Sequence, residues 1–112
     1  DTVNWVTADT LEELMAEKVP VFDVRKEGEY AAEHIEGVHS TPLNSINDHI
    51  EEFPKEEEFY VHCAGGYRSV IAASILKARG YHNIINVIGG FASIKKTAIK
   101  TTNYVCPSTL KS

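Results

Sequence analysis

Apolar and polar positions follow two alternating patterns along the chain. Short runs of β-branched and aromatic residues predict strands, and apolar residues that recur every three or four positions predict helices. The expected strands are residues 3–6, 21–24, 37–40, 59–62 and 84–88. The expected helices are residues 11–18, with Thr7 or Asp9 as a cap, and residues 27–33, 46–53, 69–79 and 91–96.

This alternation predicts an α/β domain with about five strands in a mostly parallel sheet and helices on both faces. Residues 1–96 are expected to form the domain, and residues 97–112, rich in Thr, Lys and Ser, a C-terminal tail with little regular structure. The helix predicted for residues 69–79 is apolar almost all round, which predicts that it is buried. In parallel sheets, ligands bind beyond the carboxyl ends of the strands, so a site is expected there.

Composition narrows the class of protein. The chain has 112 residues, which suits one domain, and its 43% apolar and 24% charged residues are typical of a soluble globular protein. A net charge of -5 argues against general nucleic-acid binding. No apolar run is long enough for a membrane span, and no signal peptide is visible. Two cysteines, Cys63 and Cys106, make no disulfide framework, so a cytoplasmic location is expected.

The strongest candidate for chemistry is Cys63, which follows a predicted strand and precedes the apolar helix. A thiol reacts as its thiolate, which a helix N-terminus and a nearby cation such as Arg68 favour. Gly65 and Gly66 let the backbone curl so that successive N–H groups point inward as an anion nest. Ser69 can cap the helix and offer a hydroxyl to a bound anion. These features together predict a nucleophilic cysteine inside an anion-binding loop.

Each of these residues also has a structural interpretation. A free cysteine is often a small buried hydrophobe, and two glycines often mark an ordinary turn. Arg68 could be a solvated residue at the start of the helix, and Ser69 a plain N-cap. The combination of these residues in a strand–loop–helix setting favours the nucleophile.

The segment from Cys63 to Ser69 resembles the active-site loop of rhodanese-like sulfurtransferases. The resemblance extends from about residue 3 to residue 96, and its further motifs are residues 22–25, 29–30, 34–38 with Pro42, 80–81 and 87–91. Two positions depart from the family pattern: Ile94 stands where a Trp is frequent, and Ser40 stands where an Asn is common. The first affects packing and the second a loop hydrogen bond.

The resemblance implies a rhodanese fold and transfer of sulfane sulfur through a persulfide on Cys63. Thiosulfate would be the usual laboratory donor, and cyanide or a thiol the acceptor. The implied substrate-binding residues are Ala64, Gly65, Gly66, Tyr67, Arg68 and Ser69, whose amides would hold the terminal sulfur while Arg68 binds the donor's sulfonate end. The loop also resembles those of rhodanese domains fused to metallo-β-lactamase-type hydrolases, including persulfide dioxygenases. The missing initiator Met fits an excised domain of such a fusion, and a domain of that type is an expected partner.

Two other functions stay open at this point. Cysteine phosphatases and arsenate reductases place five residues between Cys and Arg, whereas four intervene between Cys63 and Arg68. A tetrahedral oxyanion needs a wider ring than one sulfur atom does, so the shorter loop favours sulfur transfer. The second alternative is a binding or regulatory module without turnover.

Residues around the loop give further expectations. Asp23 and Arg25 could form an ion pair that supports the loop, although a plain strand-end salt bridge is the alternative. We expect no cofactor and no metal site, since His62, Cys63 and Cys106 lack zinc-like spacing. The His62 ring is expected to face away from the sulfur because neighbouring strand residues point to opposite faces.

Overall fold

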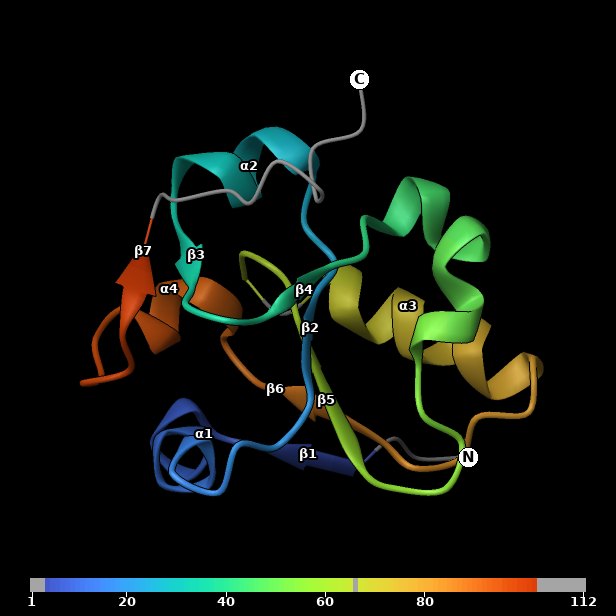
Figure 1. Cartoon of the computed structure of the whole chain (residues 1–112), viewed down its shortest axis with the longest axis horizontal. Coiled ribbons are helices and arrows are strands. Elements are labelled where there is room, and N and C mark those ends of the chain that lie inside the picture. Colours follow the sequence, from blue (N-terminus) through green and yellow to red (C-terminus); the bar gives the residue numbers. More distant parts are fainter. Residues whose placement is uncertain (1–3, 66, 103–112) are drawn as a thin grey trace.

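The chain folds around a single parallel sheet, seen in a computed structural model that describes residues 4–65 and 67–102. Five strands lie in the order β1-β6-β5-β2-β4, and all neighbours are parallel (Figure 1). They are β1 (Asn4–Val6), β2 (Val21–Asp23), β4 (His39–Ser40), β5 (Phe59–His62) and β6 (Ile84–Val87). The predicted α/β architecture is therefore confirmed, with β5 at the centre of the sheet.

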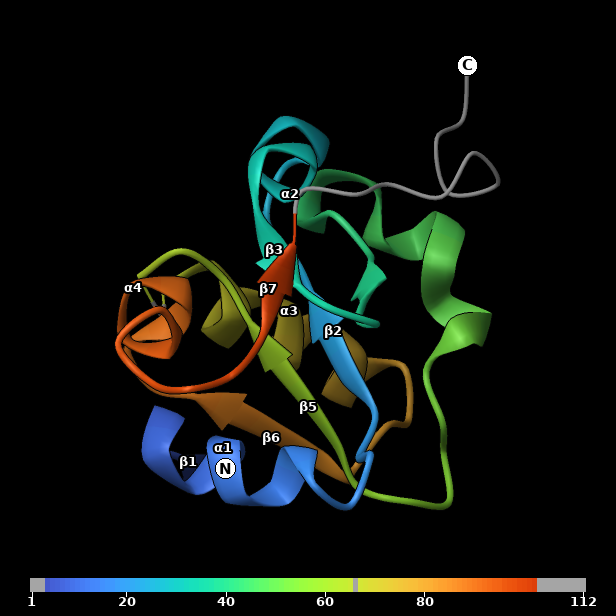
Figure 2. The same cartoon turned by 60° about the vertical axis from the view of Figure 1, so that its left-hand side comes forward.

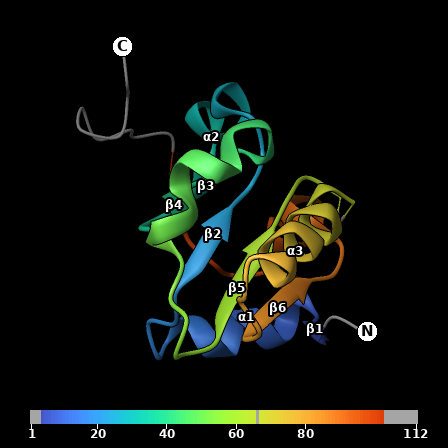
Figure 3. The ribbon, with the colours of Figure 1, turned by 90° about the vertical axis from the view of Figure 1, so that its right-hand side faces the viewer.

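Helices cover both faces of this sheet. They are α1 (Ala8–Met15), α2 (Glu27–Ala32), the 3₁₀ segment η1 (Leu43–Glu52), α3 (Arg68–Ala78) and α4 (Gly90–Ile94). Apolar residues of α3 and η1 form one core cluster with the sheet, and those of α1, α2 and α4 form the other. Figure 3 looks onto the side that carries α3 and η1. Among the described residues, no helix is both long enough and apolar enough to cross a membrane.

The central strand β5 determines towards which face of the sheet the Cys63 side chain points. All four of its residues are buried, and they alternate between the two faces. Val61 and Cys63 belong to the cluster under α3, whereas Tyr60 belongs to the opposite cluster. The His62 ring stacks near Phe91 of that opposite cluster, with ring centroids 6.0 Å apart. The prediction that the His62 ring faces away from the sulfur is confirmed.

The prediction that the apolar helix is buried is correct for only one of its faces. In α3, Ser69, Ala72, Ala73 and Leu76 are buried, but Val70 and Ile71 are 45% and 39% exposed. The helix packs on the sheet with one face only, because a small domain has no further layer to cover the other face.

A second, two-stranded sheet was not expected from the sequence. Strand β3 (His34–Ile35) pairs antiparallel with β7 (Thr101–Thr102), and Figure 2 shows the two side by side. The expectation of little regular structure after residue 96 is therefore wrong for residues 101–102, and Ile99 packs against the core. Pairing of two-residue strands leaves almost no periodic pattern, which is why the sequence did not reveal it. The domain boundary at residue 96 stays a prediction.

Candidate active site

Cys63 lies at the carboxyl end of β5, directly before the loop that leads into α3. It is 1% exposed, and its thiol donates towards Ser69 Oγ at an Sγ–Oγ distance of 3.7 Å. The Ser69 hydroxyl in turn donates a hydrogen bond to Asn86 Oδ1 of β6. The sulfur therefore lies beside a hydroxyl whose position is fixed by the neighbouring strand.

The structure corrects the role predicted for Ser69 as a helix cap. Helix α3 begins at Arg68 and its N-cap is Tyr67, with no side-chain capping bond. Ser69 lies inside the helix and is buried, and its hydroxyl contacts Asn86 and Cys63. Asn86 is a residue that sequence reasoning missed, because nothing near it in the chain marks it as part of the site.

Helix α4 holds the backbone of the Cys63 loop. The Phe91 amide donates to Cys63 O at 2.6 Å, and the Ala92 amide donates to Ala64 O at 3.0 Å. Gly90 approaches so closely that a Cβ there would lie 2.3 Å from Cys63 O. Gly90 also has a φ of +58°, a conformation that favours glycine. The glycine pair at residues 89–90 was recognised only as a family motif, and its contact with the loop emerges from the structure.

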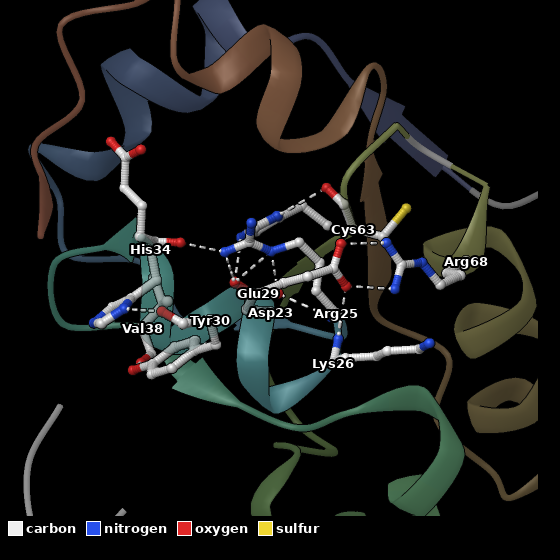
Figure 4. Close-up of polar contacts among 11 residues, drawn as sticks. Asp23, Arg25, Lys26, Glu29, Tyr30, His34, Val38, Cys63 and Arg68 are labelled. Atoms are coloured by element: carbon white, nitrogen blue, oxygen red, sulfur yellow. Dashed lines mark hydrogen bonds and ion pairs between the residues drawn. The ribbon is translucent and has the colours of Figure 1, made fainter. Parts of the chain in front are cut away.

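Arg68 forms a two-point ion pair with Glu29 of α2. Its Nη1 lies 2.7 Å from Glu29 Oε1 and its Nη2 lies 3.1 Å from Oε2, as Figure 4 shows. Hydrogen bonding to Arg68 is the largest cause that lowers the pKa of Glu29 to about 2, and the same bond raises the pKa of Arg68. Glu29 was matched only as part of a motif and not placed in the site, because 39 residues separate it from Arg68.

The predicted ion pair between Asp23 and Arg25 is confirmed. Arg25 Nη2 lies 2.8 Å from Asp23 Oδ2, Arg25 Nε lies 3.0 Å from Oδ1, and both residues are buried. The Arg25 guanidinium also lies 4.1 Å from the centre of the Phe91 ring. The Phe91 amide donates to Cys63 O, so the ion pair contacts the loop indirectly, through Phe91. Its function as a support for the loop stays a prediction.

The other predicted loop residues have different environments. Ala64 is half-buried, Gly65 is exposed, and Tyr67 is 78% exposed. Gly66 and Cys106 lie outside the described residues. In residues 4–65 and 67–102, no group of three or more His, Cys, Asp or Glu side chains is arranged to hold a metal ion.

A cavity of about 200 Å³ opens beside Arg68. It is lined by Val24, Lys26, Leu43, Asn44 and Arg68. A second cavity of about 340 Å³ shares Lys26 and Asn44 with it. The space next to the candidate nucleophile loop therefore combines apolar walls with cationic side chains.

His62 is a buried ionisable group on the far side of the strand from the sulfur. Its Nδ1 lies 3.3 Å from Cys63 O, and its Nε2 lies 3.8 Å from Asp23 Oδ2 without a hydrogen bond among the described residues. Burial lowers the pKa of His62 below its ordinary value, and the nearby Asp23 carboxylate only partly opposes this. His62 is therefore neutral in the folded protein at neutral pH.

We expect His62 to make the free energy of unfolding fall as the pH drops. An unfolded histidine takes up a proton below about pH 6.5, whereas folded His62 resists it, so the unfolded state binds more protons there. The free energy of unfolding should fall by at most about 1.4 kcal/mol for each unit by which the pH drops. Urea unfolding between about pH 7.5 and pH 5 measures it, above the range in which Glu29 titrates.

The matched variants are His62→Gln and His82→Gln, since His82 is exposed. His62→Gln should flatten the dependence of unfolding free energy on pH, and His82→Gln should leave it unchanged. Equal slopes in wild type and His62→Gln would show that folded His62 accepts a proton as readily as the unfolded chain does.

A strand that leads to a buried cysteine, a short loop and a helix packed on a parallel sheet are features of the rhodanese-like class. Residues 7–97 match the family model of the rhodanese-like domain, and the chain belongs to that family. A rhodanese-like domain protein from Staphylococcus aureus superposes with a TM-score of 0.80 at 31% identity, covering 88% of this chain and 97% of that one. The predicted family and fold are thus confirmed.

Curated relatives include sulfurtransferases and a sulfur carrier. A thiosulfate sulfurtransferase GlpE from Pseudoalteromonas translucida is 37% identical over 90 residues, which is 77% of this chain and 82% of that protein. A sulfurtransferase from Allochromatium vinosum is 30% identical over 90 residues, covering 79% and 84%. The putative sulfur carrier protein YrkF from Bacillus subtilis is 36% identical over 74 residues, or 66% of this chain.

The chain spans only part of some relatives. It covers 40% of the Bacillus subtilis protein and 21% of the adenylyltransferase and sulfurtransferase uba4 from Ogataea parapolymorpha, to which it is 37% identical over 84 residues. The domain thus resembles both proteins of about its own size and parts of longer proteins. At family level, it is related to rhodanese-like sulfurtransferases and sulfur carriers.

Proposed function

We propose that the protein transfers sulfane sulfur through a persulfide on Cys63. The observation that carries this proposal is the position of Cys63 at the carboxyl end of β5, with its sulfur beside Ser69 in the first turn of α3. A helix N-terminus presents unpaired amides and partial positive charge, which favour an anionic sulfur in front of it. The relatives named as sulfurtransferases support the same chemistry.

Thiosulfate serves as the proposed donor, and the reaction has two halves. The Cys63 thiolate attacks the outer sulfur of thiosulfate, the sulfur–sulfur bond of the donor breaks, and sulfite leaves with its electron pair. Cys63 then carries a persulfide. Cyanide or a thiolate attacks the terminal sulfur, forms thiocyanate or a new persulfide, and returns Cys63 as a thiolate.

The loop residues have proposed roles in binding the sulfur and its donor. Amides of residues 64–69 hold the terminal sulfur, and Arg68 binds the sulfonate end of the donor. A guanidinium has five N–H groups, and the Glu29 carboxylate takes two of those of Arg68. Four residues lie between Cys63 and Arg68, and this short spacing supports sulfur transfer over phosphate chemistry.

The partners in this proposal are a small anionic sulfur donor and a thiol acceptor. A metallo-β-lactamase-type domain, fused or separate, is a further proposed partner. The occurrence of similar sequences as parts of longer proteins is consistent with a fused partner domain.

Peptide mapping by mass spectrometry tests the proposal. After thiosulfate treatment, the peptide that contains Cys63 should gain the mass of one sulfur atom, and the peptide that contains Cys106 should not. Cyanide should then remove that sulfur and release thiocyanate. An unmodified Cys63 peptide would contradict the proposal, and hydrolysis of aryl phosphates without sulfur transfer would favour the phosphatase alternative.

A further inference from the structure

Glu29 places a full negative charge beside Arg68, the residue that the proposed function assigns to binding the sulfonate end of the donor. The Glu29–Arg68 pair is two-pronged and partly buried, with the side chains 37% and 28% exposed. Figure 4 shows the carboxylate facing the guanidinium, with Cys63 on the Arg68 side of the pair. The hydrogen bond and the charge of Glu29 are the larger causes that raise the pKa of Arg68, and the charge of Cys63 is a smaller one.

The position of Glu29 is fixed from its own helix as well. The backbone amide of Lys26 donates to Glu29 Oε1 at 3.0 Å, in the first turn of α2. With a pKa lowered to about 2, Glu29 is ionised at every pH at which the protein would work. The carboxylate is therefore a permanent neighbour of Arg68, and the pair has almost no net charge.

This pairing changes which anions Arg68 can attract. An anion at its remaining N–H groups gains hydrogen bonds, but it also meets the Glu29 charge a few ångströms away. The repulsion grows with the charge of the anion, so a dianion is penalised more than a monoanion.

The cavity beside Arg68 favours the same class of molecule. Val24 and Leu43 form an apolar wall in the space of about 200 Å³, which Lys26, Asn44 and Arg68 also line. An organic substituent gains free energy against such a wall, whereas a charged oxygen loses hydration there.

We propose that Glu29 is a specificity-determining residue, which, by pairing with Arg68, directs the site towards sulfur donors with an organic group and one negative charge. This inference rests on the proposed sulfur transfer at Cys63 and names its substrate class: organic thiosulfonates and persulfides in preference to inorganic thiosulfate. Glu29 acts through Arg68 and is a positioning residue.

Two donors of nearly equal shape separate charge from size. Thiosulfate is a dianion, and methanethiosulfonate replaces one of its charged oxygens with a methyl group. In both, the Cys63 thiolate attacks the outer sulfur. Sulfite leaves from the first donor and methanesulfinate from the second, and Cys63 carries the same persulfide afterwards.

The experiment compares kcat/KM for the two donors in wild type and Glu29→Gln, with cyanide as acceptor. We expect Glu29→Gln to shift the preference towards thiosulfate by about fivefold to tenfold, through a lower KM, because one unit of repulsion is removed at a half-exposed site. The shift should shrink at high salt, since mobile ions screen it. A purely structural role would instead lower kcat for both donors equally.

The matched control is Glu27→Gln, which removes the same charge from the same turn of α2 but has no ion pair with Arg68 among the described residues. It should leave the preference within about twofold of wild type, because exposed charges without contact are screened. Glu29→Asp keeps the charge and should keep the wild-type preference.

The outcomes separate this inference from the function on which it rests. If wild type takes sulfur from neither donor, the proposed function fails. If wild type is active but Glu29→Gln leaves the ratio of the two kcat/KM values unchanged, only the role of Glu29 fails. If Glu29→Gln does not fold, the wild type alone tests the inference. The catalysed rate with each donor is then divided by the rate at which that donor reacts with free cyanide. This ratio must be larger for methanethiosulfonate, and a larger ratio for thiosulfate overturns the inference.

Discussion

Replacing Cys63 with serine is expected to lower the rate of sulfur transfer by at least about 1000-fold, because the proposed reaction loses its nucleophile. A serine hydroxyl at this position does not ionise near neutral pH and is a far poorer nucleophile than a thiolate. In the proposed mechanism, the partial positive charge at the start of α3 acts on a sulfur anion that the variant cannot form. The loss should appear in kcat with every donor.

The fold is expected to survive this substitution. Serine is slightly smaller than cysteine, and its hydroxyl would lie near Ser69 Oγ, which already accepts from the Cys63 thiol. Circular dichroism and urea unfolding should therefore show a folded protein that loses about 1–2 kcal/mol at most, the scale of an imperfectly bonded buried hydroxyl. Cys106→Ser is the control and should keep full activity. Substantial turnover by folded Cys63→Ser would remove Cys63 from the mechanism.

Gly90→Ala is expected to lower the free energy of unfolding by about 2–4 kcal/mol, from overpacking and from a left-handed backbone conformation. The new Cβ would lie 2.3 Å from Cys63 O and 2.8 Å from Ala64 O, both backbone atoms that no side-chain rotation can move away. The loop must shift, which breaks the alignment of the Phe91 and Ala92 amides with it. A displacement of about 1 Å at the sulfur would lower kcat by about 100-fold.

Two other glycines make this prediction specific. A Cβ at Gly28 would meet nothing within 4 Å, so Gly28→Ala should leave activity unchanged. Gly89→Ala is strained by its own φ of +83°, but its Cβ would meet only the Ser93 side chain, so it should cost stability with a smaller loss of kcat. Urea unfolding and steady-state kinetics on the three variants measure both effects. Full activity in Gly90→Ala would show that close contact with α4 is not needed to hold the loop.

The sheet and the position of Cys63 were predictable because local sequence encodes them. Each buried strand is a short apolar run, and a cysteine directly after such a run must lie at the carboxyl end of a parallel sheet. The alternation of side chains along β5 then placed His62 and Cys63 on opposite faces of the sheet.

The contacts around the loop were not predictable, because each joins segments far apart in the chain. Glu29 lies 39 residues from Arg68, and Asn86 lies 17 residues from Ser69. A charged residue in the first turn of a short helix usually faces solvent, so nothing local distinguishes Glu29 from Glu27. The exposure of Val70 and Ile71 was also missed, since composition indicates how apolar a helix is but not how many layers cover it.

The backbone and the side chain of Cys63 are held by different parts of the molecule. Its carbonyl belongs to the contact with α4 and would be held there with any small side chain, whereas its sulfur faces α3. Mutational tolerance at this position is therefore uneven, since natural selection for the fold and selection for the reaction act on different atoms. A descendant could exchange the sulfur for another small group, lose all turnover and still inherit the same architecture. A substitution at Gly90, in contrast, would affect the fold and the reaction at the same time.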